Sequence, residues 1–176
     1  FEKLPEGAGE TLDFYQANTN LRYGETDYVA NWRAKAAERL RAWGFNTVAN
    51  WSDPALYQDP QTPFVANISV GRSARNWQGF PDAFSEAYVK SAETTAVEQC
   101  GKFRGQPMLI GYFIGNEPRW PGRNLIDRIL ADTEPSATQS FAREFLKKGD
   151  NAAAREKLLE ALSRRYFRTV VEAIRK

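Results

Sequence analysis

The 176-residue sequence contains no histidine at all. This absence excludes, within the chain, histidine general bases, histidine-based nucleophile triads and histidine metal ligands. Cys100 is the single cysteine, so the chain offers neither an internal disulfide nor a cysteine zinc cluster. Proton transfer, if this chain performs it, must therefore use carboxylates, lysine, tyrosine or a chain terminus.

Long apolar runs and large net charge are also missing. No run of 18 apolar residues occurs, so we expect no membrane span. The formal net charge is only +2, and Lys and Arg are interspersed with acids, so we expect no nucleic-acid partner. The length predicts a single domain over residues 1–176. The first residues do not resemble a signal peptide, and the chain does not begin with Met, so we expect that something upstream was removed or not included.

Hydrophobic periodicity predicts helices that alternate with short apolar strands. Helices are predicted around 13–18, at 27–43, 82–103, 123–131 and 136–147, and from 151 onward. Strands are predicted at 45–51, 63–69 and 107–115, and residues 71–81 are predicted to form a loop. The last helix carries one apolar stripe, formed by Leu158, Leu162, Tyr166, Val170 and Ile174. This order predicts an α/β fold with parallel strands, because the connections are long enough for crossovers.

The most informative segment is the apolar run from Met108 to Ile114, which ends in Gly-Asn-Glu-Pro at 115–118. Its bulk predicts a strand buried on both faces, and Pro118 ends it because proline cannot donate to a sheet ladder. Glu117 would then stand at the carboxyl end of a parallel strand, where α/β-barrel enzymes display catalytic groups. A carboxyl group that emerges from an apolar strand is easily desolvated, which suits it to general-acid chemistry.

Two segments resemble the retaining (β/α)8-barrel glycoside hydrolases known as clan A. Residues 41–47 (Arg-Ala-Trp-Gly-Phe-Asn-Thr) resemble the start of the second barrel strand, and residues 115–118 resemble the end of the fourth. Together with Phe-Tyr-x-Ala-Asn at 14–18 and Asn-Trp-Ser-Asp-Pro at 50–54, they are similar to an agarase-like branch of polysaccharide hydrolases. The resemblance implies that Glu117 is the acid/base and that Asn116 binds the sugar 2-hydroxyl. It also implies a partial TIM barrel, containing strands two to four.

Further substrate contacts are expected from aromatic and polar residues near the strand ends. Trp51, beside Asn50, and Trp120 could stack on a sugar face, although either ring could equally be part of a core. Arg119 could bind substrate hydroxyls, although such residues more often pair with neighbouring acids. Asp53 is expected to be a turn residue before a proline. Trp32 and Trp43 have helical spacing and are expected to pack, whereas Trp77 is left undecided.

The resemblance implies a glycoside hydrolase that acts on a polysaccharide, such as an agar-type galactan, without a metal or organic cofactor. A complete barrel needs about 250 residues and eight strands, and its nucleophilic Glu would lie on strand seven, outside this chain. Two alternatives therefore stay open: a catalytically inactive carbohydrate-binding fragment, or an α/β scaffold that binds a partner helix. Incomplete barrel edges would favour self-association. Polymer-degrading relatives are usually exported, so a secreted or periplasmic location is an expectation from the resemblance alone.

Overall fold

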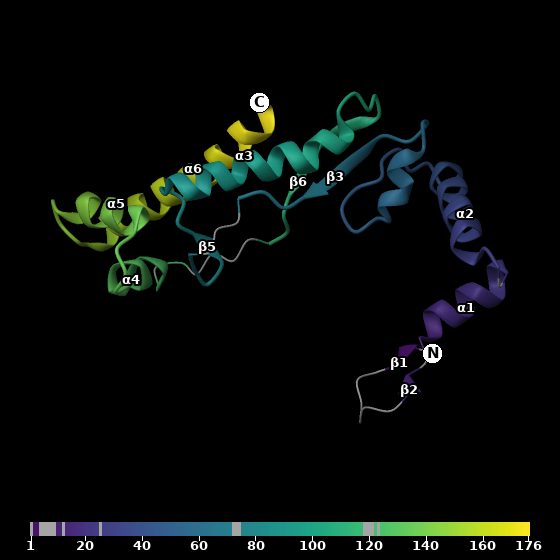
Figure 1. The fold of residues 1–176 in the computed structure, drawn as a ribbon, viewed down its shortest axis with the longest axis horizontal. Coiled ribbons are helices and arrows are strands. Elements are labelled where there is room, and N and C mark those ends of the chain that lie inside the picture. The colour runs from purple at the N-terminus through teal and green to yellow at the C-terminus, as the bar shows by residue number, and fades with distance from the viewer. Residues whose placement is uncertain are drawn as a thin grey trace. The chain divides into compact units, whose positions relative to one another are not determined.

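A computed structural model describes residues 2–3, 10–11, 13–24, 26–71, 75–117, 122 and 124–176. Figure 1 shows their elements in chain order. The contacts divide the chain into two compact units, the first formed by Phe1–Ala66 with Met108–Gly111 and the second by Asn67–Pro107 with Tyr112–Lys176. We describe each unit by itself, and the single-domain assignment stays a prediction.

The first unit begins with two short paired strands and two helices. Strands β1 (Glu2–Lys3) and β2 (Glu10–Thr11) pair antiparallel. Helix α1 (Phe14–Tyr23) is longer than the predicted turn, and α2 (Tyr28–Ala42) confirms the predicted helix at 27–43. The expected packing of Trp43 is wrong for the described chain, because the helix ends one residue earlier and this side chain is 68% exposed.

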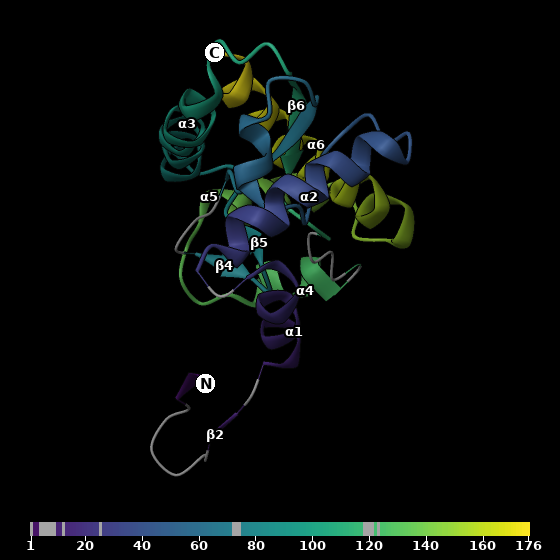
Figure 2. The ribbon, with the colours of Figure 1, turned by 90° about the vertical axis from the view of Figure 1, so that its right-hand side faces the viewer.

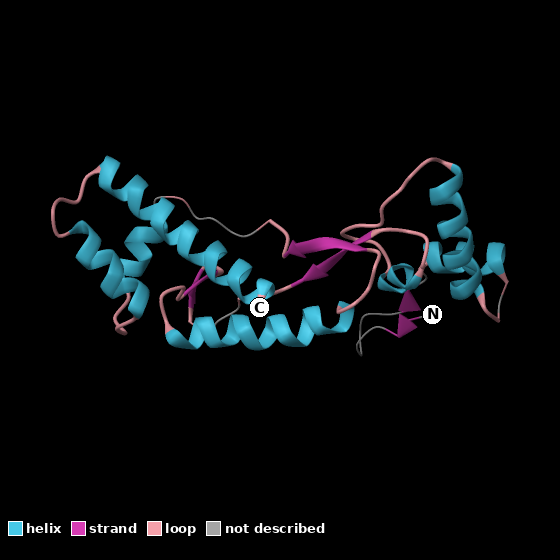
Figure 3. Cartoon of the chain, turned by 90° about the horizontal axis from the view of Figure 1, so that it is seen from above, coloured by secondary structure: helices cyan, strands magenta, loops and turns pink. Residues whose placement is uncertain are grey.

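The strand pair at the centre of the prediction is present and parallel. Strands β3 (Phe64–Ile68) and β6 (Leu109–Ile114) form a two-stranded sheet, visible side by side in Figure 3. The Phe64 amide donates to the Met108 carbonyl at 2.9 Å, and the Gly115 amide donates to the Ile68 carbonyl at 2.8 Å. The strands therefore start together and end together.

The predicted strand at 45–51 is reduced to a single parallel bridge between Val48 and Phe64. The amides of Val48 and Val65 donate across this bridge, so the segment lies on the β3 edge opposite β6. A 3₁₀-helix, Pro54–Gln58, follows it. The three parallel segments are thus neighbours in the order in which they occur along the chain.

The prediction that residues 107–115 are buried on both faces is wrong for the described chain. In β6, Ile110 is 61% exposed and Phe113 is 43% exposed. The described residues pair β6 with β3 only, so its apolar side chains lack the neighbours that a full parallel sheet would supply. Strand β3, by contrast, buries Phe64, Ala66 and Ile68.

The described residues of the second unit form four α-helices and a small hairpin. The helices are α3 (Glu86–Cys100), α4 (Asn124–Ala131), α5 (Ala137–Leu146) and α6 (Ala152–Arg175), with a 3₁₀ turn at Gly101–Phe103. The hairpin pairs β4 (Asn76–Trp77) with β5 (Phe80–Pro81), labelled next to each other in Figure 2. It was predicted as a loop. None of the described helices has the length and apolarity to cross a membrane.

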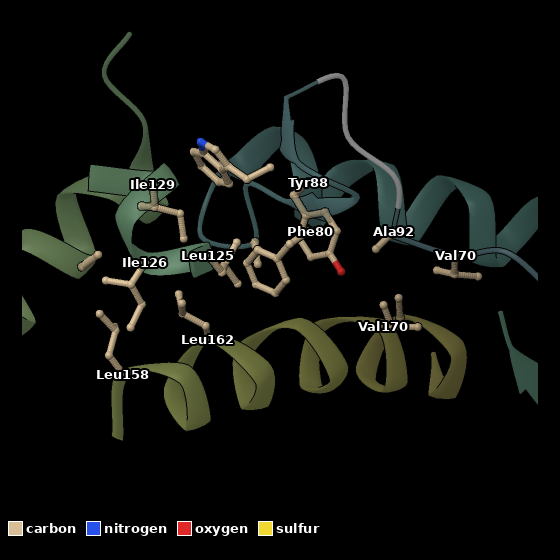
Figure 4. Packing of buried hydrophobic residues seen from close by; sticks show 14 of the residues in the cluster. Val70, Phe80, Tyr88, Ala92, Leu125, Ile126, Ile129, Leu158, Leu162 and Val170 are labelled. Atoms are coloured by element: carbon tan, nitrogen blue, oxygen red, sulfur yellow. The ribbon is translucent and has the colours of Figure 1, made fainter. Parts of the chain in front are cut away.

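The predicted stripe of the last helix forms one wall of the core of the second unit. Leu158, Leu162 and Val170 are completely buried, and Figure 4 shows them directed toward α4 and α3. Burying each such side chain contributes roughly 1.5–3 kcal/mol. Residue Tyr166 is only partly buried, and Phe167 stays 41% exposed. The stripe prediction is therefore confirmed at Leu158, Leu162 and Val170.

Helix α3 begins four residues after the predicted start at residue 82, because its N-cap is Ser85. The Ser85 hydroxyl accepts the Tyr88 amide at 3.1 Å. The buried Asp82 carboxylate instead accepts the Thr138 amide at 2.8 Å, in the first turn of α5. A helix N-terminus favours such a carboxylate, so Asp82 ties the start of α5 to the segment before α3.

Candidate active site

The strand-end segment lies where the β3–β6 ladder ends. The Gly115 amide makes the last ladder bond, and Asn116 and Glu117 follow it directly. The φ of Glu117 is +40°, which is rare for a residue with a side chain and is most often found at functional or strained positions. The backbone therefore turns sharply as it presents these two side chains.

The side chains of Asn116 and Glu117 are both exposed. The desolvation of Glu117 expected from an apolar strand is therefore absent in the described chain. The physical reason is that β6 itself is only partly covered, so the described residues form no apolar wall around the carboxylate. A low-dielectric setting for this group would have to come from other parts of a longer protein.

A pocket of about 390 Å³ lies beside Asn116, entirely within the second unit. Its lining comes from the segments after β3 and β6, from the hairpin and from α6, and includes Ser69, Asn76, Gly115, Asn116 and Tyr166. The carboxyl ends of adjacent parallel strands are the usual ligand crevice of α/β sheets. The described Glu117 is not part of the lining.

The side chain of Gln99 fixes the wall of this pocket on the β3 side. Gln99 of α3 binds the Ser69 backbone at both groups: its side-chain oxygen accepts the Ser69 amide at 2.9 Å, and its side-chain nitrogen donates to the Ser69 carbonyl at 3.3 Å. Tyr166 lines the pocket from helix α6, and burial raises the pKa of its phenol. The ring therefore stays neutral at neutral pH.

The hairpin that completes the pocket is held by a polar cluster below it. Trp77 Nε1 donates to the Asp132 carboxylate at 2.9 Å, and the Arg75 guanidinium pairs with the same carboxylate at 2.8 Å. The hydrogen bond from Arg75 lowers the pKa of Asp132. Trp77, left undecided by the sequence, is buried and belongs to the core.

The other candidate substrate contacts lie either in the first unit or among residues that the structure does not describe. Trp51 is 78% exposed with φ +69°, and the buried Oδ1 of Asn50 has no hydrogen-bond partner among the described residues. Arg119 and Trp120 lie outside the described residues. Asp53 is confirmed as a turn residue: its carboxylate accepts the Ala55 amide, which lowers its pKa, and it pairs with Arg33 at 2.7 Å.

Two curated relatives are similar in sequence. β-Agarase A of Vibrio sp. (strain JT0107) is 32% identical over 127 residues, which are 66% of this chain and 12% of the relative. β-Agarase B of the same strain is 31% identical over 159 residues, 79% of this chain and 16% of the relative. The chain is homologous to β-agarases. It spans less than a fifth of the length of either relative.

The solved structures agree with this homology. The crystal structure of an agarase, AgWH50C, superimposes with a TM-score of 0.78 at 27% identity, covering 96% of this chain and 29% of that chain. No protein-family model matches the sequence.

Among the described residues, no group of three or more Cys, Asp or Glu side chains is placed to hold a metal ion.

Besides Asn116, three side chains with polar groups line the pocket, and none of them was predicted from the sequence as a site residue. Ser69 is the last residue of the predicted strand at 63–69, so attention to strand ends could have identified it. Asn76 lies in what was predicted as loop, where no pattern marks it. Tyr166 was assigned to the core stripe, and only the structure shows that this partly buried side chain also lines the pocket.

Proposed function

We propose that this chain is the part of a retaining glycoside hydrolase that carries the acid/base residue, and that the complete protein cleaves an agar-type galactan. Glu117 protonates the glycosidic oxygen as the bond breaks, and in the second step takes a proton from the attacking water. The observation that carries this proposal is the position of Asn116 and Glu117 directly after a parallel strand, in a chain homologous to β-agarases.

The proposal includes the partial (β/α)8 barrel. The bridge segment at Val48, then β3, then β6 would be its strands two, three and four. Their parallel direction and sequential neighbourhood support this assignment, as does the helix α3 that connects β3 to β6. Retaining hydrolysis also needs a nucleophilic carboxylate about 5–5.5 Å from the acid/base. We place that group on strand seven, outside this chain.

The proposed substrate contacts follow from the same strand ends. Asn116 holds the 2-hydroxyl of the sugar next to the scissile bond, which its place in the pocket lining supports. Trp51 offers an exposed ring for stacking on a sugar, and Asn50 beside it is a proposed contact on the sequence alone. Arg119 and Trp120 are proposed contacts on the sequence alone. This chemistry requires no metal or organic cofactor.

The test measures how fast the complete protein that contains this chain releases reducing sugar ends from agarose. Glu117→Gln removes the titrating group while keeping the size of the side chain, and we expect turnover to fall by about 10²- to 10⁴-fold. Glu98→Gln, an exposed carboxylate on α3, is the matched control and should leave turnover unchanged. Full turnover by the Glu117→Gln protein would overturn the assignment. Binding of agarose oligosaccharides without hydrolysis by the unaltered protein would favour the carbohydrate-binding alternative.

A further inference from the structure

A second groove lies in the second unit and shares no lining residue with the pocket beside Asn116. Its volume is about 500 Å³, and its lining comes from one face of α6 together with Phe84 and Phe141. The face of α6 that lines it is largely polar and lies beside the buried stripe of Leu158 and Leu162. The groove therefore combines an aromatic floor with a polar rim.

The aromatic floor is a stacked pair. The ring centroids of Phe84 and Phe141 are 4.0 Å apart with planes 18° apart, and Phe145 continues the row at 5.9 Å from Phe141. Arg165 is fixed above the floor: its Cζ lies 5.5 Å from the centroid of Phe84, and its Nε donates to the Ala83 carbonyl at 3.1 Å. Phe141 and Arg165 lie over the faces of the Phe84 ring, so the floor offers a ligand the half-buried edges of these rings, which suit apolar C–H groups.

The rim is strongly cationic. Four basic side chains line it (Lys157, Arg164, Arg165 and Arg168) with one carboxylate, Glu160. Arg164 pairs with Glu160 at 2.6 Å and Arg168 pairs with Glu172 at 2.7 Å. Both pairs are solvent-exposed and therefore weak, and each guanidinium has more N–H donors than its one carboxylate partner uses.

The length of this row distinguishes a polymer from a small anion. Lys157 and Arg168 are separated by eleven residues of continuous helix, which is about 16 Å along the helix axis. Cations repeated over that distance match a chain with several anionic groups. Guanidinium groups bind tetrahedral oxyanions through paired hydrogen bonds, so sulfate esters fit this rim as phosphates would.

We propose that this groove is an accessory binding site for an anionic galactan, one whose sugar rings carry sulfate esters. The sugars pack their apolar C–H groups against the edges of Phe84 and Phe141, while the sulfates pair with Lys157, Arg164 and Arg168. The identity of the polymer as a galactan rests on the proposed function, whereas the aromatic floor and the cationic rim are independent of it. Nucleic acid is disfavoured because the chain as a whole has a net charge of only +2.

The test measures affinity of the complete protein for κ-carrageenan, a sulfated galactan, and its turnover of neutral agarose oligosaccharides. A triple variant, Lys157→Gln with Arg164→Gln and Arg168→Gln, should lose affinity for κ-carrageenan by about tenfold or more, with a shallower salt dependence. The matched control removes the same charge elsewhere on the exposed surface of the second unit, with Lys102→Gln, Arg104→Gln and Lys148→Gln. It should bind as the unaltered protein does.

Agarose turnover should be equal in both triple variants, because neither touches the pocket beside Asn116. Equal affinity of the two variants for κ-carrageenan, or no binding by the unaltered protein, would overturn the accessory site. Equal or tighter binding of duplex DNA of matched charge would overturn its assignment to a galactan. Failure of the proposed function appears separately, as absence of agarose turnover in the unaltered protein.

Discussion

Gly71 lies where the chain leaves β3, and its missing side chain allows the backbone to pass against two buried residues. A Cβ at this position would lie 2.6 Å from the Tyr88 hydroxyl and 2.8 Å from Val170 Cγ2. Its φ of +84° is also one that residues with side chains rarely adopt. Because Gly71 lines the pocket beside Asn116, this close approach fixes the pocket wall to α3 and α6.

We predict that Gly71→Ala destabilises the protein more than Gly105→Ala does. Both positions have positive φ, but a Cβ at Gly105 meets nothing within 4 Å. The comparison therefore isolates the steric clash, which should cost an additional 1–3 kcal/mol, roughly, in the free energy of unfolding. Urea unfolding of the complete protein measures it, and equal losses for the two variants would contradict the packing described.

The sequence predicted the strand-end position of the candidate site residues, but it did not predict how exposed their side chains are. Asn116 and Glu117 are recognisable because an apolar run stops at Gly-Asn-Glu-Pro, and a strand end is a local feature. Their exposure was not predictable, because it depends on whether other strands and helices cover β6. Tyr166 shows the same limit, since helical spacing assigns it to the core but does not show that its ring also borders a pocket.

At the scale of elements, a polar cluster ties the β4–β5 hairpin to the end of α4. Asp132 follows α4 directly and receives hydrogen bonds from Trp77 and Arg75, while the Arg75 guanidinium also reaches the Glu134 carbonyl at 2.6 Å. The Arg75 Cζ lies 5.9 Å from the centroid of the Trp77 ring. The hairpin wall of the pocket therefore depends on the charge of Asp132.

This dependence predicts a pH effect on stability. The pKa of Asp132 is lowered, chiefly by the hydrogen bond from Arg75, so its carboxylate stabilises the fold above the unfolded-state pKa of about 3.9. That contribution is lost as pH falls through the lower folded-state value. Asp132→Asn should therefore flatten the acid side of the stability profile, measured by urea unfolding between about pH 5 and 2.

Asp27→Asn is the control for this effect, because Asp27 makes no side-chain capping bond at the start of α2. Its acid profile should follow that of the unaltered protein. If the Asp132→Asn protein loses stability with acid as steeply as the unaltered protein does, the cluster does not hold the hairpin.

Helices were predicted more completely than strands, for a physical reason. The spacing of Leu158 and Leu162 alone indicates that α6 is a helix. The predicted ends of α2, α4 and α5 lie within two residues of the observed ends. Strand pairing depends on partners elsewhere in the chain, so the segment at 45–51 contains only one bridge at Val48. The hairpin at 76–81 falls in a predicted loop, because strands of two residues are too short to show an alternation of apolar and polar side chains.

At the scale of the whole molecule, the first unit leaves an unusual amount of apolar surface uncovered. Its large apolar side chains that are more than half exposed are Phe14, Tyr15, Leu21, Trp43, Phe45, Trp51 and Ile110. Monomeric proteins rarely expose large contiguous apolar patches without a partner. The much greater length of the β-agarase relatives offers a source for that cover.

We therefore predict that the 176-residue chain expressed alone self-associates. Analytical ultracentrifugation should show oligomers, and an environment-sensitive hydrophobic dye should bind more strongly to this chain than to the complete protein. Replacing Trp43 and Phe45 by Gln should reduce both signals, because both side chains are exposed. A monomeric chain that binds no dye would contradict the expectation.

The central claim, that Glu117 is the acid/base of a retaining mechanism, is tested most directly by chemical rescue. The complete protein with Glu117→Ala is assayed on a nitrophenyl glycoside of the agarose repeat, whose leaving group needs no protonation. The glycosyl-enzyme then forms but its hydrolysis stalls, because no base activates water. Azide needs no base, so it should restore turnover and yield a glycosyl azide of retained anomeric configuration. A rate that azide leaves unchanged, or a product of inverted configuration, would contradict the assignment.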